Sequence, residues 1–342
     1  MRHLVFIAIT VVLLAGCVHH TPFKDEYYFQ ALGEDGSVVA TADLDKVRES
    51  SFSSLLPASG ALDYALKRSE RLSLSLTPKR TDIYPLPLDE YTKSGALEGN
   101  LSKTIINSAL GLSKEFDKVK EDKLKYYSNG TLSMALPKNG ILLFSDGSYK
   151  ELYDKTILER EKLIPDDIAS YMADAMFALF INSPETLLDI GFELPQSVIQ
   201  EIDISYLGFS ESDASLLLSG TLIMKSTSSA RALTTLLKNQ LIQDAKRSGE
   251  KIDIKQLSTY FNYKETTVTI ESFALKGDMA NKAKDTLSNA LEGLVLCHYM
   301  NINALNVEMN LSSSRALRKV MTMKFAQSAA KLLSVKSQIA VQ

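Results

Sequence analysis

The sequence lacks a strong charge of either sign. Its 342 residues include 38 lysines and arginines against 41 aspartates and glutamates, so the formal net charge is −3. We therefore expect no globally basic surface and no nucleic-acid partner. Hydrophobic residues make up 45% and charged residues 23% of the chain. These proportions are typical of a folded globular protein and exclude a disordered or polytopic membrane chain.

The familiar catalytic motifs are also lacking. The chain has no nucleophile elbow, dinucleotide-binding glycine pattern, phosphate-binding loop, zinc-protease motif or EF-hand loop. His298 is the only histidine after His20, and the adjacent Cys297 points in a different direction on any helix or strand. Asp166 and Asp167 are adjacent carboxylates, but after a proline they favour the N-terminus of a helix. The sequence thus predicts no catalytic residue, no metal site and no cofactor.

One apolar run stands at the start of the chain. Three residues, Met1–His3, precede the twelve-residue run Leu4–Ala15. A helix of that length spans about 18 Å, which is too short for the hydrocarbon core of about 30 Å. The run therefore predicts a signal peptide and not a permanent transmembrane helix.

The next residues carry a resemblance. The stretch Leu14-Ala15-Gly16-Cys17 resembles the lipobox of bacterial lipoproteins. This resemblance implies cleavage between Gly16 and Cys17, a diacylglycerol thioether on Cys17, and acylation of the new amino terminus by a fatty acid such as palmitate. Several acyl chains, at about 0.8 kcal/mol per buried CH₂, anchor a protein stably. The implied location is membrane-anchored and extracytoplasmic.

The residue after the cysteine bears on the choice of membrane. In enteric bacteria an Asp there retains a lipoprotein at the inner membrane, so Val18 slightly favours the outer membrane. Lipidation of Cys17 would leave Cys297 as the only free cysteine. No intramolecular disulfide is then expected, and a hydrophobic core must stabilise the fold.

Composition and pattern divide the chain into five segments. These are a signal peptide (1–16), a tether (17–25), an α+β domain or first half (26–162), a second α+β half (163–300) and a basic tail (301–342).

The mature chain alternates strand and helix patterns. Period-two alternation and turn residues predict hairpins, formed by residues 26–32 with 37–42, 132–136 with 141–145, and 202–209 with 214–224. Single strands are predicted at 72–77 and 268–272. Helical patterns cover 43–66, with an interruption near Pro57, and also 101–112, 183–191, 227–247 and 279–294. We predict an α+β fold: an antiparallel sheet built from hairpins, with amphipathic helices packed on one face. The recurring pattern leaves an internal duplication into two related subdomains open.

The tail is basic. Between residues 301 and 342 the only acid is Glu308. The basic residues there, our candidate membrane contacts, are Arg315, Arg318, Lys319, Lys324, Lys331 and Lys336. Apolar residues at helical spacing predict an amphipathic helix, which either lies on an anionic membrane or docks on the protein's own body.

Three function classes follow from these patterns. The first is a non-enzymatic, lipid-anchored envelope protein that binds a protein partner or serves a structural role. The second is a carrier of a lipid or another apolar ligand, whose cavity the run Met176–Ile181 would line, although that run equally fits a buried strand or helix. The third is a hydrolase of unfamiliar pattern. The sequence favours the first.

Overall fold

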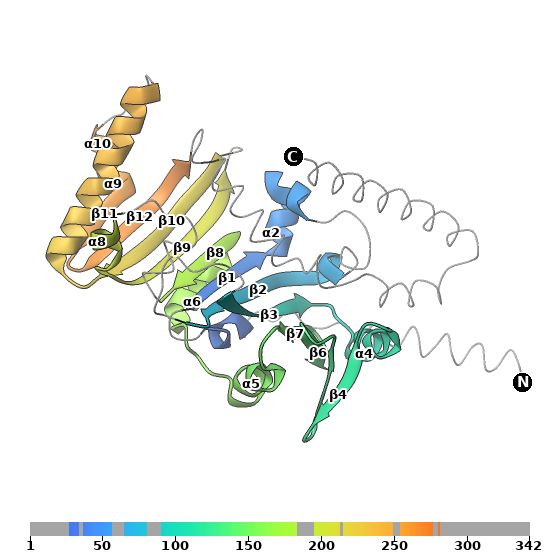
Figure 1. Cartoon of the computed structure of the whole chain (residues 1–342). Helices are drawn as coiled ribbons and strands as arrows, with labels where there is room; N and C mark the ends of the chain where they lie inside the picture. Colours follow the sequence, from blue (N-terminus) through green and yellow to red (C-terminus); the bar gives the residue numbers. More distant parts are fainter. Residues whose placement is uncertain are drawn as a thin grey trace, which may run out of the picture.

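The computed structural model describes residues 27–33, 37–56, 65–80, 90–182, 195–212, 215–248 and 254–275, together with Ala280. Twelve strands in these residues form one antiparallel sheet (Figure 1). Their order across the sheet is β11-β12-β10-β9-β8-β1-β2-β3-β7-β6-β5-β4. The predicted α+β class with a hairpin-built antiparallel sheet is confirmed.

The first half of the chain supplies seven of these strands. They are β1 (Val38–Asp43), β2 (Ser69–Pro78), β3 (Tyr91–Gly99), β4 (Asp117–Glu121), β5 (Leu124–Ser128), β6 (Ser133–Lys138) and β7 (Ile141–Ser145). Its helical segments are η1 (Tyr28–Ala31), α2 (Leu44–Glu49), η2 (Ser51–Leu55), α4 (Lys103–Leu112), α5 (Tyr149–Tyr153) and the π-helical η4 (Asp154–Glu159).

The second half supplies the remaining strands. They are β8 (Phe177–Ile181), β9 (Ile202–Ser212), β10 (Ser215–Met224), β11 (Phe261–Lys264) and β12 (Thr267–Leu275). Its helices are α6 (Asp166–Asp174), α8 (Gln196–Ile199), α9 (Thr227–Ser248) and α10 (Ile254–Tyr260). The predicted boundary between the halves, at residues 162 and 163, falls between η4 and α6. The sheet continues across this boundary because β8 pairs with both β1 and β9.

Several predicted elements are confirmed. Hairpins join β6 to β7 and β9 to β10. The alternating leucines lie in β2, where Leu72 and Leu74 are buried. The long helix α9 buries Ala230 and Leu233 as its apolar spacing requires. The predicted helices at 183–191 and 279–294 lie outside the described residues, apart from Ala280.

The first predicted hairpin is wrong. Residues 28–31 form the 3₁₀ helix η1 and not a strand. The Gln30 side chain donates to the Ile164 carbonyl at 2.9 Å and to Asp166 Oδ1 at 2.8 Å, which ties η1 to the start of α6. The strand β1 pairs instead with β2 and β8, which are distant in sequence. Long-range packing thus overrides the local hairpin signal.

Helices cover both faces of the sheet. We call one the α9 face, where Ala230 and Leu233 join a buried cluster with Val38 and Ile181. The other is the α6 face, where the Tyr171 ring of α6 packs against Tyr206 of β9 with centroids 5.2 Å apart. In the second half α9 and α10 follow the predicted arrangement on one face.

The central strands explain the additional helices on the α6 face. Strand β8 sends Phe177 and Ile181 to the α9 face and Ala178 and Phe180 to the α6 face, and all four are buried. A strand that is apolar on both faces needs cover on both, as in a parallel sheet. The run Met176–Ile181 is therefore a buried strand, one of the alternatives that its sequence left open.

A buried hydroxyl on α6 gives a first testable prediction. The Tyr171 hydroxyl is buried near the backbone of Gly208 but does not reach normal hydrogen-bond geometry with it. Burial, and secondarily Tyr206, raise the pKa of Tyr171 to about 12, and the Gly208 backbone offsets part of the rise. Tyr171→Phe removes an unsatisfied group, so we expect unfolding free energy at pH 7 to stay constant or rise by about 1 kcal/mol.

The pH dependence of this variant follows from the same pKa. A raised folded-state pKa favours the neutral phenol, so the stability it contributes is present below pH 10 and is lost as the pH rises toward 12. Urea midpoints at pH 8 and pH 11 should therefore differ less in Tyr171→Phe than in the wild type. Tyr149→Phe is the matched comparison, because its hydroxyl donates to the Ala135 carbonyl at 3.2 Å and its removal should destabilise the protein. Equal losses in both variants would contradict this prediction.

Candidate binding groove

Most of the residues singled out in the sequence lie outside the described part of the structure. These are Gly16 and Cys17 of the lipobox, Cys297, His298 and the basic residues of the tail. Lipidation and tail contact with a membrane stay predictions. Among the described residues, no helix is long and apolar enough to cross a membrane.

The paired aspartates have a structural role. Asp166 and Asp167 occupy the first turn of α6, as predicted. Hydrogen bonds from Lys162, at 2.8 Å, and from Gln30 hold the pKa of the Asp166 carboxyl below its usual value. This carboxyl therefore stays ionised and fastens η1 and the 160–165 link to α6. Within the described residues, no three His, Cys, Asp or Glu side chains are grouped to hold a metal ion.

A groove lies on the α9 face at one edge of the sheet. It encloses about 650 Å³ and is open to solvent. Its lining comes from residues 227–239 of α9 and from one side chain of the edge strand β11. The residues are Thr227, Ser228, Arg231, Ala232, Thr235, Leu236, Asn239 and Tyr263.

Local sequence fixes both walls of this groove. The Ser226 hydroxyl accepts from the Ser229 amide at 3.1 Å and caps the start of α9. Buried Ala230 and Leu233 hold one side of the helix on the sheet, which leaves Arg231 and Thr235 on the groove side. The opposite wall is set by pairing of β11 with β12, in which Tyr263 lies opposite Val268 on the α9 face.

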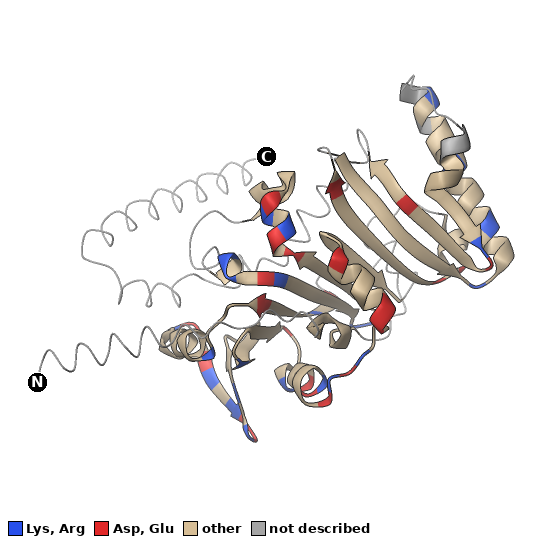
Figure 2. Cartoon of the chain, turned by 180° about the vertical axis from the view of Figure 1, so that it is seen from behind, with Lys and Arg blue, Asp and Glu red and all other residues tan. Residues whose placement is uncertain are grey.

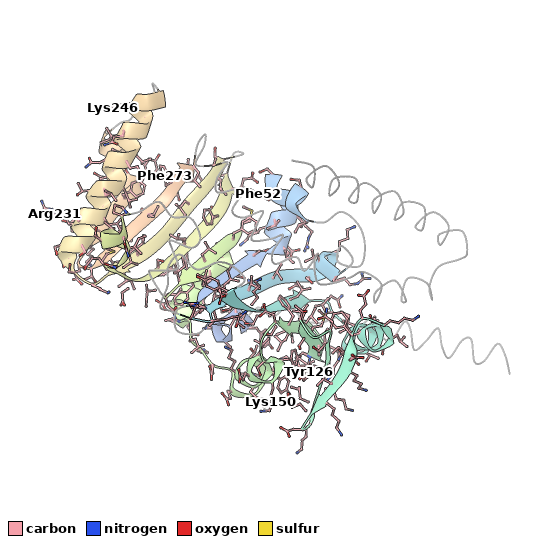
Figure 3. The ribbon with its side chains drawn as sticks, viewed as in Figure 1. Phe52, Tyr126, Lys150, Arg231, Lys246 and Phe273 are labelled. Carbon is pink, nitrogen blue, oxygen red and sulfur yellow. The ribbon has the colours of Figure 1, made fainter. Side chains whose placement is uncertain are left out.

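The electrostatics of the groove are those of a single cation among neutral groups. Arg231 is exposed and, within the described residues, its guanidinium forms no salt bridge. Figure 3 shows Arg231 and Lys246 well separated along α9. The remaining lining offers hydroxyls, one amide, and the apolar surface of Leu236, Ala232 and the Tyr263 ring. Such a groove suits a ligand with an acidic group and apolar flanks, and it contains no nucleophile–base pair.

Strand β11 lies at one end of the sheet and pairs with no further strand among the described residues. Lys264 and Thr267 pair across a two-residue turn, so they form the hydrogen-bonded pair next to the turn. Hydrogen-bonded and non-hydrogen-bonded pairs alternate along an antiparallel ladder, so Tyr263 and Val268 form a non-hydrogen-bonded pair. The backbone N–H and C=O of Tyr263 therefore point away from β12. The Tyr263 amide in fact donates to the side-chain oxygen of Asn262 at 2.8 Å. A polar side chain thus occupies the position that a further strand's carbonyl would take.

The other edge of the sheet, β4, differs from β11. Exposed Lys118 and Lys120 line it, and Lys120 lies directly opposite Lys125 of β5. Blue segments along this hairpin are visible in Figure 2. Lysines on an edge strand discourage pairing with another chain. The two edges of the sheet therefore present different chemistry to a partner.

Sequence reasoning missed this groove. Strand β11 has only four residues, and its single alternation of Phe261 and Tyr263 with polar neighbours is too short to distinguish from a loop. The outer side of α9 reads as an ordinary solvated face. The one available signal was the Asn262-containing polar–aromatic alternation directly before the turn at Glu265 and Thr266.

Comparison with known proteins gives structural neighbours only. No protein-family model and no curated protein matches the chain. Among solved structures, crystal form I of TP0453 matches with 12% identity and a TM-score of 0.48, covering 80% of this chain and 98% of TP0453. Crystal form IV matches with 12% identity and a TM-score of 0.49, covering 80% of this chain and 99% of TP0453. Similarity at this level does not transfer a function from TP0453 to this chain.

Proposed function

We propose that this protein is a lipid-anchored, extracytoplasmic envelope protein whose α+β body binds a protein partner. The open groove between α9 and β11 carries the binding part of the proposal. Among the described residues, β11 pairs with no further strand beyond β12, and Arg231 has no acidic partner. The lipobox carries the anchoring part. Val18 favours the outer membrane as the site of attachment.

A carrier of an apolar ligand has less support. Most of the run Met176–Ile181 is buried in the strand β8 and its packing, and it is absent from the lining of the groove. The groove itself is open to solvent, and Arg231 places a charged group in its lining. An apolar ligand is better held by an enclosed apolar pocket.

The anchoring proposal predicts the behaviour of Cys17→Ser. The thiol of Cys17 is the atom that would take the diacylglycerol, and serine lacks it. We expect complete loss of label from an alkyne-bearing palmitate analogue, with the protein released from membranes or left as a longer precursor. Cys297→Ser is the matched control and should keep its label. Undiminished label on Cys17→Ser would refute lipidation at this site.

We also propose that the tail, residues 301–342, adds a second attachment to an anionic membrane. Its net charge of about +5, from six basic residues and one acid, supports this proposal. Cosedimentation of unlipidated protein with anionic vesicles should depend on the tail and weaken with added salt. Equal sedimentation with and without residues 301–342 would contradict it.

A further inference from the structure

The edge strand β11 and helix α9 line two sides of the groove. Helix α9 lies on the same face as the Tyr263 side chain. A strand added beyond β11 would lie about 4.8 Å away, and every second side chain would point to the α9 face. These side chains would enter the groove, while the backbone of the added strand would pair with the outward groups of β11.

Charge and polarity define the strand that fits. Arg231 is the cation of the groove, so a carboxylate on the added strand complements it. Residues two positions before and after that carboxylate would meet Leu236, Ala232 and the Tyr263 ring, which favours small apolar side chains. The opposite face of the strand would continue the polar side of β11, where Asn262 and Lys264 are exposed.

We propose that the groove binds an extended, acidic segment of a partner protein, which adds to β11 as a further strand of the sheet. The proposal rests on the proposed function, since it names the surface and the chemistry of the protein partner.

The first experiment measures binding of a blocked, fluorescein-labelled heptapeptide to the full chain in detergent. Its sequence, Thr-Val-Thr-Glu-Thr-Val-Thr, puts the acid and both valines on one face. We expect saturable anisotropy and about fivefold weaker binding when Glu is replaced by Lys. Arg231→Glu should reverse this preference. Lys246→Glu, which changes the same charge on α9 outside the groove lining, should leave it unchanged.

The second experiment tests backbone pairing. N-methylation of the peptide amides on its pairing edge should abolish binding, because the methyl groups remove donors and obstruct the strand. Asn262→Ala should bind the unmodified peptide about threefold more tightly, since the competing side-chain acceptor on the Tyr263 amide is gone. A methylated peptide that binds as well as the parent, or an unchanged affinity in Asn262→Ala, would overturn strand addition.

Two further outcomes would also overturn the proposal. One is absence of peptide binding up to millimolar concentration in a folded protein. The other is a concentration-dependent dimer, broken by Arg231→Glu, which would assign the groove to a second copy of this chain. Failure of peptide binding with intact palmitate labelling would reject the occupant of the groove while leaving the anchor standing. Loss of labelling at Cys17 with intact peptide binding would reject the lipid anchor while leaving the acidic strand in the groove standing.

Discussion

Gly99→Ala is expected to lower the free energy of unfolding by about 3 kcal/mol or more. Gly99 ends β3 with a φ of +155°, which side chains rarely adopt. A Cβ at this position would lie 2.3 Å from the Arg68 carbonyl oxygen and 2.4 Å from the Ser69 Cα. Both are backbone atoms, so neither moves without disturbing the irregular register between β2 and β3.

Gly130→Ala is the matched control for this prediction. Gly130 also has a positive φ, +86°, but a Cβ there would meet nothing within 4 Å. We expect a loss of about 1 kcal/mol from backbone conformation alone. Urea denaturation at neutral pH measures both variants, and their difference isolates the steric clash. Equal losses would show that the approach of β3 to residues 68–69 does not constrain the fold.

Separating the two halves of the chain is expected to abolish folding of both. In the intact protein, residues 38–42 of β1 pair with residues 177–181 of β8. Val38 and Val39 of β1 point to opposite faces of the sheet, and each side chain is at most 3% exposed. Fragments 26–162 and 163–342 would each expose a fresh, apolar strand edge, which favours aggregation over folding. We expect poorly dispersed amide spectra or insoluble protein from each fragment.

A chain cut between its two halves tests whether folding requires a continuous chain or only contact between the halves. A protease site inserted after Glu161, in the link between η4 and α6, should be cut without dissociation in native buffer. The β1–β8 pairing and the bonds of Gln30 to Ile164 and Asp166 then still hold the halves together. A dispersed spectrum from either isolated fragment, or separation of the nicked halves in native buffer, would contradict a shared core.

Elements with a long or regular local signal could be predicted from the sequence. The β6–β7 hairpin has its Pro-Lys-Asn-Gly turn between the alternating residues 132–136 and the continuous apolar run 141–144. Helix α9 has 22 residues with a buried apolar stripe. The pairing of β1 could not be predicted, because its partners lie far along the chain. The aromatic run at Tyr27–Phe29 imitates a strand, yet its packing and the bonds of Gln30 select a 3₁₀ helix.

The candidate groove was beyond sequence reasoning for a related physical reason. Its two walls, α9 and β11, are separated by α10, and no local pattern indicates that Arg231 and Tyr263 line one surface. The unpaired edge of β11 is a property of the strand order of the whole sheet. The residues of one segment do not indicate which strands will be its neighbours in the sheet.

The central position of β1 also sets a delay in biosynthesis. Val38 and its partner Ile181 are 143 positions apart (181 − 38). At about 5–20 residues per second, a ribosome needs roughly 7 to 30 seconds to make the intervening chain. The proposed export across a membrane delivers the chain in the same order, so the β8-facing side of β1 has no strand to pair with until residues 177–181 follow, and a neighbouring unfolded copy offers the same apolar sequence. Expression at low rate should therefore raise the soluble yield of this protein more than added stability does.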